Sequence, residues 1–439
     1  MTVASPIPDL DRVLAFLRER CHPEVPLEQL EVNHVTVRED GSVRLLYEGP
    51  GPGGGVLRLT ARPVRDIQGR RLEAEINRRH PAGHGAASAG FDQPAVYAPD
   101  LGLLFAFFPV DERLESLPTA ASGSAIAPVL EAALASRTAG AHVRDVAATA
   151  LRYKPRRKCL FRYDITWAGT KTRGLPPVVY ARVARPGNFE RSRDTLPRLR
   201  VATADAGLAF DLPEPLGVVP ELCMELFSSV PGVPLFTMVE DTGFPGLCGR
   251  VGAALHQFHS LPVTLDGERN PADTVACLAE IAPQFASLLP AERARVDGLA
   301  GALATGLRAL PASRHCLIHG DFHGDNVLVD GASIALIDLE DCAMGDPAHD
   351  VASNWAQLTW HSAKRGARTS LPRAGRQAFL GAYLERTDAQ TAKGIPIHAA
   401  LHCFLNAYQC LRRPQDPARH EDAEVMLRAC EDVLEKGLP

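Results

Sequence analysis

Two carboxylates and an amide lie at the ends of one short predicted hairpin. Asp321 closes a His-Gly-Asp triplet, Asn326 follows it, and Asp338 comes after the second strand. The strands NVLV and IALI flank an Asp-Gly pair at 330–331, and this dipeptide between apolar runs is a strong hairpin signal. The hairpin can therefore bring the three side chains to one point. Their oxygens suit Mg²⁺, which is usually bound by one or two carboxylates together with substrate phosphates.

These residues fit a phosphoryl-transfer site. Such a site needs a metal that neutralises charge and a group that orients or deprotonates the acceptor hydroxyl. Asp321 lies in a loop before a strand and suits the second role, and Asn326 and Asp338 suit the metal positions. We interpret His319 as a brace for this loop in preference to a proton carrier.

Three motifs in this region occur in a fixed order. They read HGDFHGDN (319–326), IDLED (337–341) and GDPAHDVA (345–352). In this order and at this spacing they resemble the aminoglycoside phosphotransferase and choline kinase superfamily, whose signature is HGDxxxxN, an ID-F/L-E segment and a GDPxxDLA-type segment. The resemblance implies a bilobal protein-kinase-like fold, with a small β-rich N-lobe, a helical C-lobe and ATP between the lobes.

The same resemblance implies roles for five acidic or amide residues. Asp321 is the expected catalytic aspartate, and Asn326 and Asp338 are the expected metal ligands. Asp346 and Asp350 are expected to stabilise the helical lobe, Asp346 as the cap of the helix that follows it.

A basic turn lies inside the segment ALRYKPRRKCLFRY, residues 150–163. It resembles a first hairpin in which a basic turn replaces a glycine-rich loop. Lys154 and Arg157 of this turn, with their basic neighbours, could approach the nucleotide phosphates. An ordinary solvated hairpin turn is the alternative.

The strand VVYARVARP, residues 178–186, departs from the family pattern. Arg182 stands where such kinases usually carry a lysine for the α- and β-phosphates. Arginine stays charged and binds phosphate in a forked manner, but its reach differs from that of lysine. Glu190, on the next predicted helix, is a candidate partner for Arg182. Main-chain atoms from Glu225 to Phe227 are expected to read adenine.

Strand and helix signals divide the chain into three regions: an α+β domain at 1–125, a kinase N-lobe at 126–229 and a helical C-lobe at 230–439. The first region has helical patterns at 9–20 and 70–79 among short strands, and the second repeats this order. VLRLTARP (56–63) aligns weakly with VYARVARP (179–186). An internal duplication is one interpretation, and two unrelated α+β segments are the other. A copy would have Leu59 in place of Arg182 and no catalytic loop, so it would be a degenerate N-lobe.

Helical patterns dominate from residue 231 onward. We predict helices at 246–261, 272–287, 291–309, 347–362, 374–386, 396–412 and 420–436. The catalytic hairpin lies within this helical region. The predicted fold class is therefore α+β.

Composition narrows the class of protein. The 47 basic and 52 acidic residues give a net charge of −5, which argues against a nucleic-acid or membrane-surface protein. The sequence shows no signal peptide and no long apolar run, and its ten scattered cysteines include no CxxC, so we expect a cytoplasmic enzyme. His315, His319 and His323 recur every four residues, but a zinc site is disfavoured because that spacing aligns side chains only on a helix.

The sequence thus predicts a phosphotransferase that uses ATP and Mg²⁺. The expected acceptor is a hydroxyl of a small molecule such as a sugar, an aminoglycoside or an amino-alcohol. The alternative is a nucleotide-binding pseudokinase that acts as a scaffold or regulator, and the arginine at position 182 motivates it. The acceptor, the choice between ATP and GTP and the oligomeric state stay open.

Overall fold

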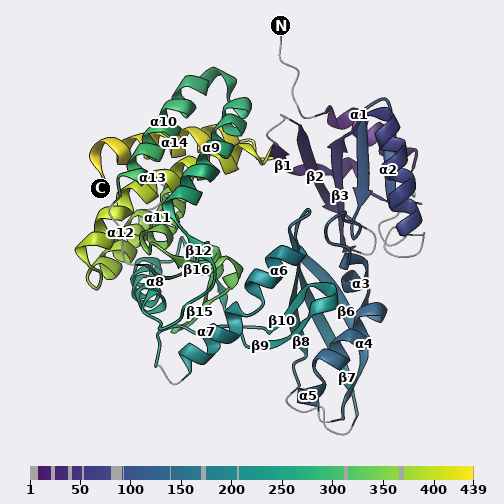
Figure 1. Ribbon diagram of the computed structural model, residues 1–439, viewed down its shortest axis with the longest axis horizontal. Helices are drawn as coiled ribbons and strands as arrows, with labels where there is room; N and C mark the ends of the chain where they lie inside the picture. The colour runs from purple at the N-terminus through teal and green to yellow at the C-terminus, as the bar shows by residue number, and fades with distance from the viewer. Residues whose placement is uncertain are drawn as a thin grey trace. The chain divides into compact units, whose positions relative to one another are not determined.

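The computed structural model describes residues 8–20, 25–37, 42–51, 54–80, 91, 93–138, 140–169, 175–204, 207–310, 315–364 and 370–438. The chain forms two compact units, coloured by residue number in Figure 1. The first unit comprises Met1–Glu190, Leu216–Ser228 and Arg412–Gln415, and the second comprises Arg191–Pro215, Ser229–Leu411 and Asp416–Pro439. The domain bounds at 1–125, 126–229 and 230–439 stay predictions.

Among the residues that the structure describes, the first unit contains two five-stranded sheets with the same strand order. One runs β1-β2-β3-β5-β4 and the other β6-β7-β8-β10-β9. In each case helical chain joins the third strand to the fourth: α2 (Asp66–Arg79) in the first sheet, and α6 (Pro186–Ser192) and α7 (Thr195–Thr203) in the second. The strands are β1 (Glu31–Val37), β2 (Val43–Pro50), β3 (Val56–Pro63), β4 (Ala95–Ala98), β5 (Leu103–Phe107), β6 (His142–Lys154), β7 (Lys158–Ala168), β8 (Val178–Ala184), β9 (Pro215–Val219) and β10 (Met224–Ser228). This shared order supports the hypothesis of an internal duplication.

Helices pack on both sheets because alternate strand residues are apolar. On the first sheet, Phe16 of α1 (Leu10–Arg18) stacks on Phe105 with ring centroids 5.8 Å apart. On the second sheet, α3 (Leu117–Ala121) and α4 (Gly123–Ala133) cover the face that carries Phe161 and Tyr163, and the Tyr163 hydroxyl donates to the carbonyl of Ala120 at 2.8 Å. A short α5 (Ala135–Thr138) follows α4.

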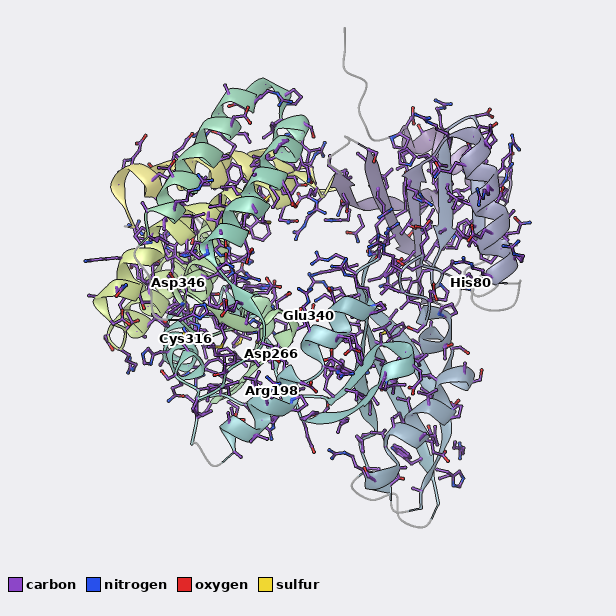
Figure 2. The ribbon with its side chains drawn as sticks, in the orientation of Figure 1. His80, Arg198, Asp266, Cys316, Glu340 and Asp346 are labelled. Carbon is purple, nitrogen blue, oxygen red and sulfur yellow. The ribbon has the colours of Figure 1, made fainter. Side chains whose placement is uncertain are left out.

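The second unit is mostly helical, as predicted. Its helices after α7 are α8 (Phe244–His259), α9 (Pro271–Leu288), α10 (Arg293–Arg308), α11 (Ala348–Lys364), α12 (Leu371–Leu384), α13 (Ala389–Leu411) and α14 (Arg419–Lys436). Helix α7 joins this unit through an ion pair of 3.2 Å between Arg198 and Asp266, both labelled in Figure 2. The α+β fold, with a β-rich N-terminal part and a helical C-terminal part, is confirmed.

The helix start predicted at residue 396 is wrong. The helix predicted from residue 396 begins at Ala389, and Pro396 lies inside it. Asp388 explains the earlier start, because its carboxylate accepts the main-chain N–H groups of Gln390 and Thr391 at 2.9 and 2.8 Å. This cap satisfies N–H groups that a helix start leaves without partners.

The predicted catalytic hairpin is present in the second unit. Its strands β14 (Val327–Asp330) and β15 (Ser333–Leu336) are antiparallel, with Val327 opposite Leu336. The hairpin shares a three-stranded sheet with β11 (Val233–Pro234), and a second such sheet contains β12 (Glu268–Arg269), β16 (Ala343–Gly345) and β13 (Cys316–Ile318).

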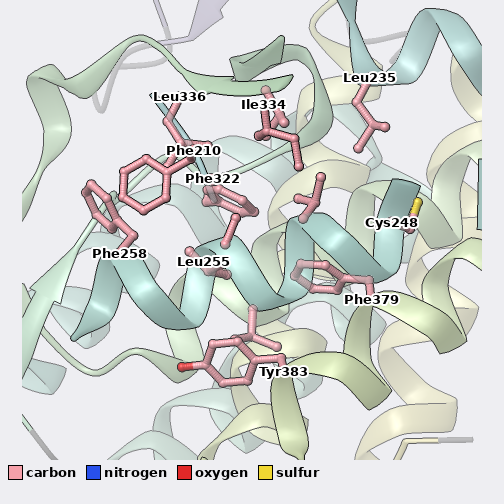
Figure 3. Close-up of a cluster of buried hydrophobic side chains, with 14 of the residues drawn as sticks. Phe210, Leu235, Cys248, Leu255, Phe258, Phe322, Ile334, Leu336, Phe379 and Tyr383 are labelled. Carbon is pink, nitrogen blue, oxygen red and sulfur yellow. The ribbon is translucent and has the colours of Figure 1, made fainter. Parts of the chain in front are cut away.

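Helix α8 supports the hairpin from below in the core of this unit. Figure 3 shows Leu255 and Phe258 of α8 beside Phe322 and Leu336, which come from the catalytic loop and β15. The opposite side of α8 meets Phe379 of α12. The catalytic segment therefore rests on a helix that is itself packed on both sides.

Within the described ranges, no helix combines the length and apolar character that a membrane span requires. The cytoplasmic location stays a prediction.

Candidate active site

The predicted catalytic loop, residues 319–326, begins directly after β13 and is fixed by one buried carboxylate. The side chain of Asp350, on α11, accepts the main-chain N–H of His319 at 2.5 Å and that of Gly320 at 2.9 Å. Gly320 has a φ of +81°, and a Cβ there would lie 2.1 Å from the carbonyl oxygen of Asp341. Glycine is therefore required at this position for both conformation and space.

Asp350 is itself held by a buried histidine and tyrosine. His259 Nε2 lies 3.0 Å from the Asp350 carboxylate, and His259 Nδ1 lies 2.8 Å from the hydroxyl of Tyr383. Burial alone would raise the pKa of Asp350, but the hydrogen bond from His259 and the neighbouring histidines hold that pKa below its ordinary value. The brace of the catalytic loop is thus an ionised carboxylate.

His319 connects the loop to the far end of the hairpin. Its side chain is fully buried, and its Nε2 lies 3.0 Å from the carbonyl oxygen of Ile337 at the far end of the hairpin. The histidine therefore ties the loop to the segment that carries Asp338. Within the part of the chain that the structure describes, no group of three or more His, Cys, Asp or Glu side chains could hold a metal.

The hairpin brings together the three residues that the sequence singled out. Asn326 Nδ2 donates to the carbonyl oxygen of Asp321 at 2.8 Å. The carbonyl oxygen of Asn326 accepts the N–H of Ile337 at 3.0 Å, which places the next residue, Asp338, beside it. Asp338 has a left-handed backbone with a φ of +60°, which is uncommon for a residue other than glycine. The Asp321 side chain is 40% exposed and so is accessible to a substrate.

Asn326 and Asp338 offer the kind of oxygen ligands that Mg²⁺ has in nucleotide-binding sites. Asn326 offers an amide oxygen, since the hydrogen bond to Asp321 uses its nitrogen, and Asp338 offers a carboxylate. Magnesium usually keeps several waters and takes its other oxygens from substrate phosphates, so a pair of protein ligands is adequate.

The sequence did not reveal two further residues at this loop. His323 Nε2 lies 3.9 Å from an oxygen of the Asp321 carboxylate and 3.3 Å from Asn326 Nδ2. Arg269, on β12, donates to the carbonyl oxygen of Gly320 at 3.0 Å and lies 2.5 Å from His349 Nε2. His323 drew attention only through its spacing from other histidines. Arg269 has no local signal, because its strand is two residues long and distant in sequence.

In the first unit, Arg182 forms a buried ion pair. Its Nη2 lies 2.6 Å from an oxygen of Glu225, and the two residues are 8% and 7% exposed. They are directly opposite each other on β8 and β10. From the sequence we expected main-chain atoms of Glu225 to contact adenine, and we expected Glu190 to be the partner of Arg182. Both assignments stay predictions, but the Glu225 side chain now has a role that the sequence did not indicate.

An aromatic pair lies next to this ion pair. Phe227 is opposite Tyr180 in the same two strands, and their rings stack with centroids 6.2 Å apart. Because side chains two residues apart share a face, this pair lies on the same face as Arg182 and opposite the face that α3 and α4 cover. A charged pair and an aromatic pair therefore share the face of the sheet that α3 and α4 do not cover.

The basic turn joins β6 to β7. Lys154 and Lys158 are opposite each other where the hairpin closes, and Lys158 is opposite Ala184 of β8. Ala184 is two residues from Arg182, so both lysines lie on the Arg182 face of the sheet. Arg157 is exposed in the turn itself.

Comparison with known proteins gives one family match and several structural matches. The model of the phosphotransferase enzyme family matches residues 166–393, slightly more than half of the 439 residues. This range contains Arg182, Glu225, Phe227 and the whole catalytic segment, but not Lys154 or Arg157. A comparison with curated proteins finds none that is similar.

The structural matches are low in sequence identity. The choline kinase of Cryptosporidium parvum Iowa II is 14% identical, and the match covers 66% of this chain and 89% of that one with a TM-score of 0.45. A choline/ethanolamine kinase family protein of Mesorhizobium loti is 16% identical over 70% and 95% of the two chains, with a TM-score of 0.43. The macrolide 2′-phosphotransferase MphH of Brachybacterium faecium is 18% identical over 68% and 98%, with a TM-score of 0.42.

Proposed function

The chain belongs to the phosphotransferase enzyme family, and on that premise we propose that it transfers the γ-phosphate of ATP to a hydroxyl group of a small molecule. The observation that carries the proposal is the convergence of Asp321, Asn326 and Asp338 at the ends of one braced hairpin. The acceptor class is a sugar, an aminoglycoside or an amino-alcohol, in line with the motifs of the catalytic segment.

Asp321 is the proposed base. Its carboxylate would orient the acceptor hydroxyl and take its proton as the oxygen attacks the γ-phosphorus. The exposed position of the side chain and the fixed backbone of the loop support this role. His323, 3.9 Å away, would help to hold the carboxylate in place.

Asn326 and Asp338 are the proposed ligands of Mg²⁺. Bound there, the ion would neutralise charge on the nucleotide phosphates. The left-handed backbone at Asp338 supports this assignment, because such a conformation in a residue other than glycine recurs at functional sites.

The first unit would bind the nucleotide. Arg182, Lys154 and Arg157 are the proposed phosphate contacts, and Glu225 and Phe227 belong to the strand proposed to meet adenine. The support is that Arg182, Lys154 and the Tyr180–Phe227 ring pair lie on one face of the second sheet. Glu225 would act through Arg182 by fixing its guanidinium.

The test compares two neighbouring acidic residues of one loop. Asp321→Asn keeps the shape of the side chain but removes the base, so we expect the transfer rate to fall by about 10²–10⁴-fold while Mg·ATP still binds. ADP release should be measured with amino-alcohols, sugars and aminoglycosides as acceptors, and binding by calorimetry.

Asp325→Asn is the matched control. Asp325 is 62% exposed in the same loop, so its variant should keep the rate of the unaltered protein. Unchanged turnover in Asp321→Asn would refute the proposed role of Asp321.

A second function has one observation in its favour. Arg182 replaces the usual lysine and is engaged by Glu225, which suits a nucleotide-binding pseudokinase that acts as a scaffold or regulator. Binding of Mg·ATP by the unaltered protein, without ADP release for any acceptor, would favour this alternative.

A further inference from the structure

The turn between β6 and β7 is held by a carboxylate from the N-terminal region. Asp111 follows β5 and is only 6% exposed. One of its oxygens accepts the main-chain N–H groups of Arg113 at 2.8 Å and Leu114 at 3.2 Å. The other accepts the hydroxyl of Tyr153 at 2.6 Å and the main-chain N–H of Arg156 at 2.7 Å. Asp111 thus fixes its own segment and the basic turn at once.

Glu112 adds a second attachment. One of its oxygens lies 2.6 Å from a guanidinium nitrogen of Arg156, and the other contacts Arg62 of β3. The side chains of Arg156 and Glu112 are 18% and 28% exposed, so the ion pair is partly shielded from solvent. The turn is therefore joined to the first sheet through a side chain as well as through its backbone.

The backbone of the turn requires such support. Arg156 has a φ of +62°, a conformation that costs a residue other than glycine roughly 1–2 kcal/mol. The turn, Lys154–Lys158, contains no glycine that would adopt it freely. The hydrogen bond from Arg156 N–H to Asp111 offsets this cost.

Tyr153, which Asp111 binds, and the two lysines of the turn lie on opposite faces of the second sheet. Tyr153 packs in the cluster with Cys159 and Phe161, on the face that α3 and α4 cover. Lys154 is the next residue along β6 and lies on the opposite face, which it shares with Lys158 and Arg182. Asp111 therefore holds the turn from the Tyr153 face of the sheet, while Lys154 and Lys158 lie on the opposite face.

We propose that Asp111 is a positioning residue for the nucleotide, so that the N-terminal region is a working part of the nucleotide site. It sets the conformation of the Lys154–Lys158 turn, and through it the places of Lys154 and Arg157. The inference rests on the proposed function, since it assumes that this turn meets the phosphates of ATP.

The experiment uses the full chain with two variants of Asp111. In Asp111→Asn a single oxygen remains, and the amide nitrogen cannot accept from an N–H group, so the bond to Arg156 or the bonds to Arg113 and Leu114 must be lost. Asp111→Ala loses all of them. We expect the KM for ATP to rise about tenfold in Asp111→Asn and at least as much in Asp111→Ala, with kcat changed less than about twofold.

Hydrogen exchange gives a second readout that does not depend on the acceptor. The amides of the Lys154–Lys158 turn should exchange faster in both variants in the absence of nucleotide. Glu73→Gln is the matched control, because Glu73 lies in the same region and its carboxylate also accepts a main-chain N–H, that of Tyr97 at 3.1 Å. It should leave both the KM for ATP and exchange in the turn unchanged.

The outcomes separate this inference from the proposed function. If the unaltered protein binds Mg·ATP and the Asp111 variants bind it equally well, the positioning role is overturned and the phosphotransferase proposal stands. A fall in kcat without a rise in KM would also overturn it. If the unaltered protein binds no nucleotide, the proposed function fails and the inference fails with it.

Discussion

Asp350 is the residue that most directly shapes the catalytic loop. It accepts two successive main-chain N–H groups, from His319 and Gly320, and is backed by His259 and Tyr383. The sequence predicted a stabilising role for it but not these partners. Asp346, labelled in Figure 2, is confirmed as the cap of α11, since its carboxylate accepts the N–H of Ala348 at 2.9 Å.

Removing the charge of Asp350 should cost stability in a pH-dependent way. Its pKa is lower in the folded chain than in the unfolded one, so the carboxylate stabilises the fold above the unfolded value of about 4, and this stabilisation is lost as the pH falls toward the folded value. We expect Asp350→Asn to lose about 1–3 kcal/mol near neutral pH and to show a smaller loss on acidification.

Urea unfolding at several pH values checks this prediction. Tryptophan fluorescence is a suitable signal, because two of the three tryptophans, Trp355 and Trp360, lie on α11 beside Asp350. Asp325→Asn serves as the exposed control. A pH profile identical to that of the unaltered protein would show that Asp350 carries none of this stability.

Close packing of two helices supports the hairpin at the level of elements. Gly252 of α8 meets α12 so closely that a Cβ there would lie 2.4 Å from the carbonyl oxygen of Phe379. Gly249, one turn earlier in α8, has more room: its Cβ would lie 3.8 Å from the carbonyl oxygen of Ala378. The two glycines are therefore a natural pair for measuring this contact.

Alanine at the two positions should have opposite effects. Alanine favours a helix over glycine by up to about 1 kcal/mol, so Gly249→Ala should stabilise the protein by that amount. In Gly252→Ala the contact with a backbone atom outweighs this gain, and we expect a net loss of about 1–3 kcal/mol. Chemical unfolding measures both, and stabilisation by Gly252→Ala would contradict the close contact.

At the scale of the whole molecule, the two sheets of the first unit repeat one strand order but not one chemistry. Arg182 and Glu225 are opposite each other on β8 and β10, and the aligned pair in the first sheet is Leu59 opposite Phe107. Both of these are fully buried apolar residues. If the sheets arose by duplication, the first sheet has two apolar core residues in place of the charged pair. Its role would then be to support the second sheet.

A late segment of the chain completes the first sheet. Arg412 lies just after α13, and its side chain donates to the carbonyl oxygen of Val35 at 2.8 Å and to the hydroxyl of Thr36 at 3.2 Å. Its main-chain carbonyl accepts the N–H of Val35 at 2.9 Å. Because β1 is at the edge of its sheet, Arg412 covers strand groups that would otherwise be open to solvent.

Truncating this arginine should loosen the edge strand. We expect Arg412→Ala to lower the free energy of unfolding by about 1–2 kcal/mol and to speed amide exchange along β1. The neighbouring Arg413 is exposed, and Arg413→Ala should do neither. Equal exchange in the two variants would show that the arginine side chain does not hold the edge.

The sequence alone determined the hairpin and the positions of the three polar residues at its ends. Its turn dipeptide, its two short apolar strands and the spacing of Asp321, Asn326 and Asp338 are local features, and local features are readable in order along a chain. The helical character of the second unit was readable for the same reason, since amphipathic spacing repeats within each helix.

Only the tertiary structure decided which residues, distant in sequence, contact Arg182, the loop after β13 and the basic turn. Glu225 is opposite Arg182 because of strand register, Asp350 reaches the loop from a later helix, and Asp111 reaches the basic turn from the segment after β5. Each of these is a single carboxylate without periodicity, so nothing in its neighbourhood marks its partner. Such pairs are set by how sheets and helices pack, and the packing exists only once the chain has folded.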